Sequence, residues 1–343
     1  MKAVVLAAPG DLRVESVAEP ALVDPGDAIV RVSASAICGA DLFPYHGHTP
    51  GFENGTILGH EFVGTVEDVG PGVSALRRGQ RVVNTSMTSD GTCMHCRAGR
   101  RTQCQSRALF GYSGVYPRLE GGQAELVRVP FSDRCLWPIP DEVSDEDAVF
   151  LSDMLPTGHG AVQRGGVRIG AVVVVLGLGC VGLMATMVAV GTAGKVIAVD
   201  GIADRRDLAS ALGADVVDPG GAADAVGAAT DGVGADVVIE AAGAKGALDA
   251  SLELVRGRGT VSVVGAHFEP DYPLNNARMF EREITLRFTV GDPGADREML
   301  LGAIAAGKFE PSRVITDRVP LDEAPDAYRV FDAREATKVL LEP

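Results

Sequence analysis

The stretch that decides the fold is VVVVLGLGCVG, residues 172–182, in which five apolar residues run directly into a glycine-rich turn. The apolar run predicts a buried strand, and the turn has the pattern G-x-G-x-x-G ahead of a helical run. In that pattern the first glycine permits the turn, the second lets the backbone approach a pyrophosphate, and the third lets helix and strand pack closely. The sequence therefore predicts a dinucleotide-binding loop. The residues expected to contact the cofactor are Gly177, Gly179, Cys180, Val181 and Gly182.

An acidic residue follows this loop at the place where dinucleotide-binding folds carry one. The next strand run ends at Asp200, about 20 residues beyond the loop. A carboxylate there accepts hydrogen bonds from the ribose hydroxyls and repels a 2′-phosphate, which favours NAD(H) over NADP(H). The basic pair Arg205 and Arg206 argues the other way, and Arg205 is counted among the expected cofactor contacts.

The alternation of strands and helices around this loop extends over the middle of the chain. Strand runs at 172–176, 196–200, 216–217, 235–239, 260–264 and 284–289 alternate with helical runs at 181–190, 204–212 and 246–254. Such alternation predicts a doubly wound parallel sheet. Residues before about 155 show short strands between Gly, Pro and Asp turns, typical of a partly open all-β barrel. We predict an α/β protein in which residues 156–293 are inserted between 1–155 and 294–343.

The net charge of −15 over 343 residues makes nucleic acid and anionic membrane surfaces poor partners for this chain. The run 171–194 is uncharged and long enough to span a bilayer, but its glycines fit a strand, a turn and a buried helix better. The apolar start of the chain is too short for a signal peptide and predicts a first strand. We therefore expect a cytoplasmic protein with no nucleic-acid or membrane partner.

Three of the six cysteines, Cys93, Cys96 and Cys104, lie close together in the sequence. Thiolates at this spacing in a polar loop suit a closed tetrahedral zinc site, and Asp90 would supply its fourth ligand. In a chain of this length the pattern indicates metal binding rather than a disulfide framework. Reduced thiols without metal and a disulfide remain the alternatives.

A second set of possible ligands is scattered: Cys38, His60 with Glu61, and Asp153. Thiolate, imidazole and carboxylate could hold a catalytic zinc with one coordination position open for water or substrate. Their spacing alone does not identify such a site, because an isolated cysteine or histidine is usually packed in a core.

At these positions the sequence resembles the zinc-containing medium-chain alcohol dehydrogenases over nearly its whole length. The motifs that carry the resemblance are ICGAD (37–41), GHE (59–61), GPGV (70–73), GQRV (79–82), GGQAE (121–125), LSDMLPTG (151–158) and GRG (257–259), together with the cysteine and glycine loops. LFGY (109–112) and LSDMLPTG are most similar to the branch that contains glutathione-independent formaldehyde dehydrogenases and tetrameric alcohol dehydrogenases.

The resemblance implies a GroES-like β-barrel catalytic domain together with a Rossmann domain. It also implies that Cys38, His60 and Asp153 bind a catalytic zinc, with Glu61 beside them as an outer or exchangeable ligand. A catalytic and a structural zinc per chain, NAD(H), and a small alcohol, aldehyde or ketone substrate follow from the same resemblance. So does a homodimer or homotetramer joined through the edge strand near 284–289.

Three positions depart from the pattern of this family. Asp90 stands where the structural zinc loop usually begins with a cysteine. Ala40 replaces the serine or threonine whose hydroxyl usually takes the alcohol proton, and Phe43 replaces a histidine that passes it on. The nearby residues that could replace this relay are Tyr45, His46, His48 and Thr157.

We expect hydride transfer between a nicotinamide and an alcohol or carbonyl carbon, with zinc as the Lewis acid. The missing relay motivates an alternative, reduction of a conjugated C=C bond, because positioned acid–base groups contribute roughly 100- to 10,000-fold to a rate. A non-catalytic NAD(H)-binding protein is a further alternative, and the presence of all four candidate ligands argues against it.

Overall fold

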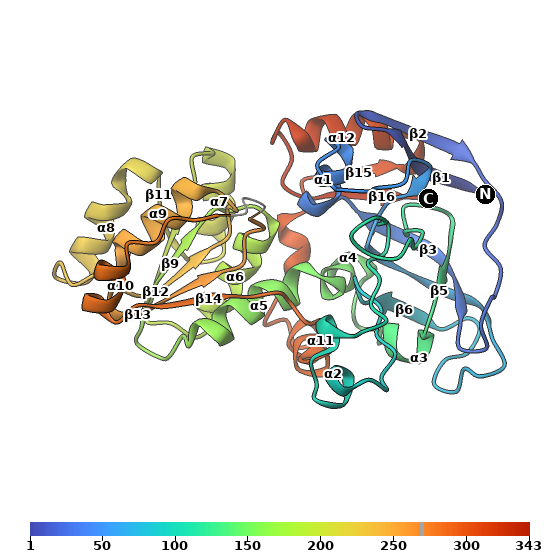
Figure 1. The fold of residues 1–343 in the computed structure, drawn as a ribbon, viewed down its shortest axis with the longest axis horizontal. Coiled ribbons are helices and arrows are strands. Elements are labelled where there is room, and N and C mark those ends of the chain that lie inside the picture. Colours follow the sequence, from blue (N-terminus) through green and yellow to red (C-terminus); the bar gives the residue numbers. More distant parts are fainter. Residues whose placement is uncertain (268–270) are drawn as a thin grey trace. The chain divides into compact units, whose positions relative to one another are not determined.

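The computed structural model describes residues 1–267 and 271–343 and divides into two compact units (Figure 1). Unit 1 comprises Met1–Asp153 and Asp292–Pro343, and unit 2 comprises Met154–Gly291. Both boundaries lie two residues before those expected from the sequence. Unit 2 is therefore a single insertion into the chain of unit 1.

Unit 2 is built on a six-stranded sheet in which every neighbouring pair is parallel, in the order β11-β10-β9-β12-β13-β14. The strands are β9 (Val172–Leu176), β10 (Lys195–Val199), β11 (Asp215–Val217), β12 (Ala235–Glu240), β13 (Val255–Val263) and β14 (Thr285–Phe288). The chain order reverses at β9, which has β10 on one side and β12 on the other. This confirms the predicted doubly wound sheet, and folds of this kind bind ligands at the carboxyl ends of the strands where the order reverses.

The helices of unit 2 cover this sheet. They are α5 (Met154–Gly165), α6 (Cys180–Val190), α7 (Ala203–Ala211), α8 (Ala222–Ala229), α9 (Lys245–Leu254) and α10 (Asn276–Arg282), with a 3-10 turn, η4 (Pro219–Gly221). α5 was not predicted from the sequence, because one proline and three glycines make it a poor helix former. Burial stabilises it instead: ten of its twelve residues are buried, and a Cβ on Gly158 would lie 2.5 Å from the backbone nitrogen of Ala185 in α6.

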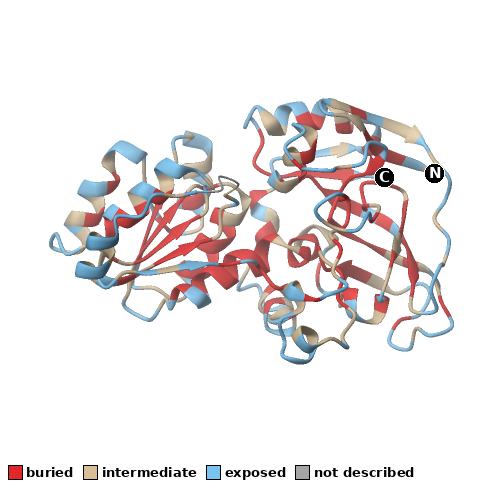
Figure 2. Ribbon diagram, in the orientation of Figure 1, coloured by how far each residue is buried: buried red, intermediate tan, exposed pale blue. Residues whose placement is uncertain are grey.

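Unit 1 is built largely of strands, as the short-strand pattern predicts, and these strands form two sheets. The larger follows the order β15-β16-β3-β5-β6-β8, with β7 also paired to β3, and the smaller is β2-β1-β4. Its strands are β1 (Lys2–Ala8), β2 (Asp11–Ser16), β3 (Ala28–Ala36), β4 (Thr56–Ile57), β5 (Glu61–Val69), β6 (Arg81–Asn84), β7 (Leu126–Val129), β8 (Leu136–Pro138), β15 (Asp317–Pro320) and β16 (Val339–Glu342). The buried residues of each unit concentrate on its strands, and exposed residues lie on the outer sides of the helices (Figure 2).

Short helices fill the connections of unit 1. They are η1 (Gly39–Asp41), α1 (Leu42–Tyr45), α2 (Met94–Arg97), η2 (Arg101–Gln103), α3 (Ser132–Cys135), α4 (Asp145–Ala148), η3 (Val149–Ser152), α11 (Arg297–Ala305), η5 (Pro311–Val314), η6 (Leu321–Glu323) and α12 (Ala324–Asp332). No helix among the described residues is long and apolar enough to cross a membrane. The uncharged run 171–194 instead contains β9 and α6.

Strand register in unit 1 brings distant residues together. Ala36 in β3 lies opposite Glu61 in β5 on one side and opposite Leu340 in β16 on the other. The residues just after β3, at the start of β5 and just before β16 therefore meet at one place, although they are far apart in the sequence.

Phe62 is a test of the core of unit 1. It is fully buried and lies edge-on to Phe110 at 5.3 Å between ring centroids. We expect Phe62→Ala to lower the free energy of unfolding of unit 1 by about 3–5 kcal/mol, because removal of the ring leaves a cavity that the surrounding residues cannot fill completely. The fluorescence of Trp137, the single tryptophan, reports urea unfolding of this unit. Val115→Ala, at a side chain 55% exposed, should change the free energy of unfolding by less than about 0.5 kcal/mol. Equal effects of the two substitutions would contradict this assignment of the core.

Candidate active site

A compact group of possible metal ligands forms where β3 and β5 end. Cys38 follows β3 and caps η1, while His60 directly precedes β5 and Glu61 is its first residue. All three are buried, and their ligand atoms lie within 4.8 Å of one another. Asp153 follows η3, and its Oδ2 is 3.5 Å from His60 Nε2. The structure thus brings together the four scattered residues of the predicted catalytic set.

The chemistry of this group fits a divalent metal ion. His60 Nε2 and Glu61 Oε1 are buried and have no hydrogen-bond partner among the described residues. Burial raises the pKa of the Cys38 thiol to about 11, so its thiolate form needs a cation beside it. A dry cluster of sulfur, nitrogen and oxygen donors with unused lone pairs is the donor set that zinc prefers.

Asp41 orients two of these ligands. Its Oδ1 accepts a hydrogen bond from His60 Nδ1 at 3.1 Å, and its Oδ2 accepts from the Cys38 backbone N–H at 3.0 Å. Because Nδ1 donates to a carboxylate, the lone pair of the neutral ring lies on Nε2, toward the other ligands. Asp41 belongs to the ICGAD motif, but no role was predicted for it from the sequence. The sequence feature that could have indicated this role is the position of Asp41 three residues after Cys38.

A further layer of buried polar residues supports Asp41. Gln123 Nε2 donates to Asp41 Oδ2 at 3.5 Å and to the Ala36 carbonyl at 3.3 Å. The Tyr328 hydroxyl, from α12, donates to Gln123 Oε1 at 2.8 Å. A Cβ on Gly59, which has φ +97°, would lie 2.4 Å from Gln123 Cγ, so glycine is required for this approach. These residues were not predicted from the sequence, because nothing local connects them.

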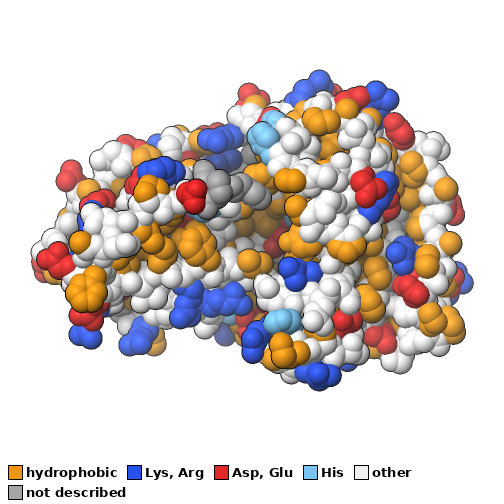
Figure 3. Space-filling model, in the orientation of Figure 1, with side chains coloured by type: hydrophobic (Ala, Val, Ile, Leu, Met, Phe, Trp, Pro, Cys, Tyr) orange, Lys and Arg blue, Asp and Glu red, His pale blue; other side chains and the backbone are white. Residues whose placement is uncertain are grey.

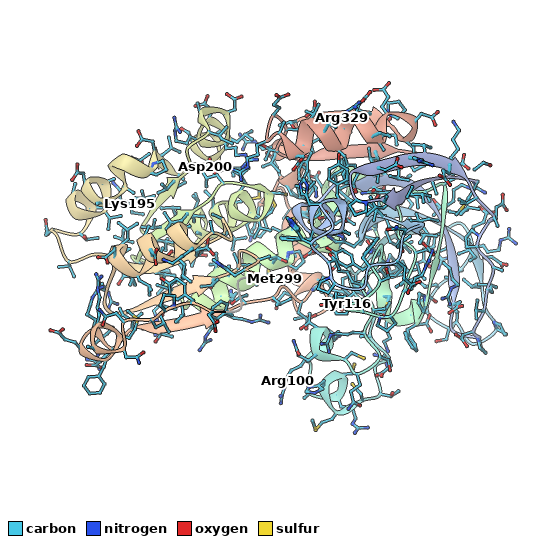
Figure 4. The ribbon with its side chains drawn as sticks, turned by 45° about the horizontal axis from the view of Figure 1, so that its top comes forward. Arg100, Tyr116, Lys195, Asp200, Met299 and Arg329 are labelled. Carbon is cyan, nitrogen blue, oxygen red and sulfur yellow. The ribbon has the colours of Figure 1, made fainter. Side chains whose placement is uncertain are left out.

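The cysteine loop forms a second group, in the part of unit 1 that holds α2 and η2, near the Arg100 label of Figure 4. Ligand atoms of Asp90, Cys93, Cys96 and Cys104 lie within 4.8 Å of one another, which suits a tetrahedral zinc site. All six cysteines are free, so the disulfide alternative is wrong for this structure. Asp90 Oδ1 accepts the backbone N–H groups of Cys93 and Thr92, and these donors hold the pKa of Asp90 well below its usual range.

The glycine loop of unit 2 has the geometry of a dinucleotide cradle. Gly177 has φ +90°, and a Cβ on Gly182 would lie 1.8 Å from the Gly177 carbonyl oxygen. A Cβ on Gly179 would meet nothing within 4 Å, which leaves room at the N-terminus of α6. Cys180 and Val181 are the first two residues of that helix. The loop therefore fits a pyrophosphate at a helix N-terminus.

Asp200, labelled in Figure 4, follows β10 and holds the glycine loop. Its Oδ2 accepts the Leu178 backbone N–H at 2.7 Å, and its Oδ1 accepts that of Ile202 at 2.8 Å. A carboxylate has about four acceptor positions, so capacity remains for ribose hydroxyls. Of the basic pair on α7, Arg206 donates to the Asp200 carbonyl at 2.8 Å, and Arg205 is half-buried.

Comparison with known proteins decides the family. Residues 24–141 match the model of the alcohol dehydrogenase GroES-like domain, and residues 180–304 match that of zinc-binding dehydrogenases. A Mycobacterium tuberculosis protein named as a probable zinc-binding alcohol dehydrogenase is 37% identical over 340 residues, which cover 99% of this chain and 87% of that one. The chain belongs to the zinc-containing medium-chain alcohol dehydrogenase family.

Solved structures of this family share the fold. An alcohol dehydrogenase from Thermus sp. ATN1 has a TM-score of 0.95 and 39% identity, covering 100% of this chain and 99% of that one. A Sinorhizobium meliloti protein classed as a zinc-binding dehydrogenase, solved with NADP bound, has a TM-score of 0.87 and 32% identity over 100% and 99%. The predicted α/β class, with a GroES-like and a Rossmann domain, is confirmed.

The departures from the family pattern at Ala40 and Phe43 leave a specific local structure. The Ala40 N–H points at Cys38 Sγ at 3.5 Å, and the Ala40 carbonyl accepts a hydrogen bond from the buried Tyr112 hydroxyl. Among the proposed substitutes, His46 is paired with Asp332 at 2.9 Å on the surface.

The other candidate substitutes for the relay are placed differently. The Tyr45 ring packs on that of Tyr328 at 5.8 Å between centroids, and His48 is exposed. Thr157 lies in unit 2, where a Cβ on Gly291 would be 2.1 Å from its Oγ1. Its catalytic role stays a prediction.

Asp90→Asn separates turn formation from metal binding in the cysteine loop. The amide oxygen can still accept the two backbone hydrogen bonds, but the negative charge is lost. We expect zinc affinity of this loop to fall roughly tenfold or more, since losing even an outer partner of a metal ligand costs about that much. Competition with a colorimetric chelator measures it, with Asp68→Asn, an exposed carboxylate in the same unit, as the control. Unchanged zinc release would mean that Asp90 only shapes the turn.

Proposed function

We propose that this protein is a zinc-dependent, NAD(H)-linked dehydrogenase that interconverts an alcohol and a carbonyl compound. The observation that carries the proposal is the pair of buried, unpartnered atoms, His60 Nε2 and Glu61 Oε1, beside Cys38 and Asp153. Lone pairs left unused in a dry site are unfavourable unless a ligand takes them up. A catalytic metal ion with an open position is the simplest such ligand.

Each residue then has a distinct task. Cys38, His60 and Asp153 hold the catalytic zinc, and Glu61 is an exchangeable partner at its edge. Asp41 fixes the ring orientation of His60 through the hydrogen bond to Nδ1. When bound, zinc supplies Lewis acidity that lowers the pKa of an alcohol, and the nicotinamide supplies the hydride chemistry. The structural zinc is assigned to Asp90, Cys93, Cys96 and Cys104.

NAD(H) is proposed in preference to NADP(H). The proposal is supported by the position of Asp200 at the end of β10, where its charge would repel a 2′-phosphate. The Sinorhizobium meliloti relative, with NADP bound, shows that this family includes NADP binders. The contacts assigned to the cofactor are Gly177, Gly179, Cys180, Val181, Gly182, Asp200 and Arg205.

A second candidate function is reduction of a conjugated C=C bond by the same cofactor. Ala40 favours it, because no hydroxyl is present at the position that usually receives the alcohol proton. The Tyr112 hydroxyl beside it already donates its proton to the Ala40 carbonyl. Product analysis with unsaturated aldehydes and ketones separates the two reactions: an unsaturated alcohol indicates carbonyl reduction, and a saturated carbonyl indicates C=C reduction.

A homodimer or homotetramer is proposed through the β14 edge of unit 2. β14 ends the six-stranded sheet, and Phe288 on it is 65% exposed. Phe280 on α10 is 88% exposed, and hydrophobic side chains are visible over this part of unit 2 in Figure 3. An unpaired strand edge with exposed aromatic side chains favours pairing with a second copy.

The metal assignment is tested by Cys38→Ala. We expect turnover, followed by NADH absorbance with a panel of primary and secondary alcohols, to fall by roughly a thousandfold or more, because Lewis-acid stabilisation worth several kcal/mol is lost. The variant should also lose the catalytic zinc and keep the structural zinc. Cys135→Ala, at a buried cysteine outside both groups, is the matched control. Full turnover in Cys38→Ala would refute the proposal.

Asp200→Asn tests the cofactor preference more cleanly than removal of the side chain, because Asp200 also holds the loop. The amide oxygen can keep the hydrogen bond from Leu178, while the hydrogen bond from Ile202 and the charge that repels a phosphate are lost. We expect the ratio of kcat/KM for NAD to that for NADP to fall about tenfold, equivalent to about 1.4 kcal/mol. Asp204→Asn, an exposed carboxylate on the following helix, serves as the control. If the ratio stays the same, Asp200 does not select the cofactor.

A further inference from the structure

Lys338 and Glu61 form a buried ion pair at the edge of the candidate metal centre. Both side chains are 0% exposed, and Lys338 Nζ donates to Glu61 Oε2. Burying two charges is expensive, and a buried ion pair is weak evidence for stability by itself. Its place among the metal ligands points to a role in the site.

The ammonium group of Lys338 is held from several directions. Besides Glu61, it donates to the Ile37 carbonyl at 3.2 Å, and it lies 5.8 Å from the centroid of the Phe150 ring. Lys338 immediately precedes β16, which pairs with β3, and β3 pairs with β5. The position of the cation is therefore set by three adjacent strands of one sheet.

The two oxygens of Glu61 have different environments. Oε2 is engaged by Lys338, whereas Oε1 has no hydrogen-bond partner among the described residues and lies 3.9 Å from His60 Nε2. The carboxylate is thus anchored through one oxygen and offers the other to the group of ligands. Such an arrangement allows Glu61 to approach a metal ion without giving up its anchor.

We propose that Lys338 is a positioning residue that tethers Glu61 at the edge of the metal centre and keeps it from becoming a permanent ligand, an inference that rests on the proposed zinc function. A catalytic metal needs a coordination position that stays open. Without Lys338, Glu61 would be a buried carboxylate with no charge to balance it, and a metal ion held by the neighbouring ligands would be the cation within reach of its free oxygen. Glu61 then closes the open position.

Cobalt substitution of the full-length protein tests this tether, because the visible absorption of cobalt(II) depends on its ligands. We expect both candidate metal groups to take up cobalt; because the cysteine loop is the same in every variant, the spectrum of a variant minus that of the wild type reports on the Cys38 centre. Lys338→Met removes the cation at similar length. The matched variant Lys338→Met/Glu61→Gln removes both charges, which leaves no unpaired charge in the core.

We expect Lys338→Met to shift the cobalt spectrum and to weaken imidazole binding at the open position by about 10- to 100-fold. The double variant should return both properties to those of the wild type, because the effect requires the Glu61 carboxylate. A wild-type spectrum and imidazole affinity in Lys338→Met would overturn the proposal, as would a shift that persists in the double variant. If Lys338→Met does not fold, the double variant Lys338→Met/Glu61→Gln still tests the proposal. A cobalt spectrum that differs from that of the wild type would then overturn the tether.

A cobalt-loaded Cys38→Ala protein separates failure of the tether from failure of the proposed function. If Cys38→Ala loses the part of the wild-type cobalt spectrum that comes from the Cys38 centre, cobalt binds at Cys38. The comparison of the Lys338 variants then tests the tether independently of the metal assignment. An unaltered spectrum in Cys38→Ala would overturn the metal assignment and the tether together.

Discussion

In the antiparallel pairing of β3 with β5, Ala36 lies opposite Glu61, and the candidate metal centre depends on that register. Side chains alternate between the two faces of a strand, so a slip by one residue would turn His60 and Glu61 to opposite faces from those they occupy. The same register places Cys38, which follows β3, beside them. β16 extends the arrangement on the other side of β3 and brings Lys338 to the group.

Compensation of buried charge is the second constraint. Cys38, Glu61 and Asp41 lie together where water has little access, and each carboxylate has specific donors: Lys338 for Glu61, and His60, Gln123 and a backbone N–H for Asp41. Within this group, His60 Nε2 and Glu61 Oε1 have no hydrogen-bond partner among the described residues, and they lie 3.9 Å apart. The divalent cation proposed for this group would complete the balance of charge.

In unit 2 the constraint is a steric one in the glycine loop, where the backbone must leave room for the proposed phosphate ligand. Gly177 adopts a left-handed conformation and Gly182 touches the turn, so both positions exclude a side chain for steric reasons. Asp200 ties the turn from the neighbouring strand. One carboxylate therefore both shapes the loop and provides the charge proposed to select the cofactor, and substitution there affects two properties at once.

The sequence by itself determined the features whose residues are neighbours in the chain. The glycine loop, the strand 172–176, the parallel sheet and the cysteine group follow from local spacing, because short spacing restricts where side chains can lie. The catalytic set does not, since Cys38, His60 and Asp153 are separated by long segments, and only a family resemblance indicated them. Tertiary structure alone decided the roles of Gln123, Tyr328 and Lys338, because strand register and burial bring residues from opposite ends of the chain into contact. It also decided that α5 is a helix, because burial overrides the low helix propensity of its glycines and proline.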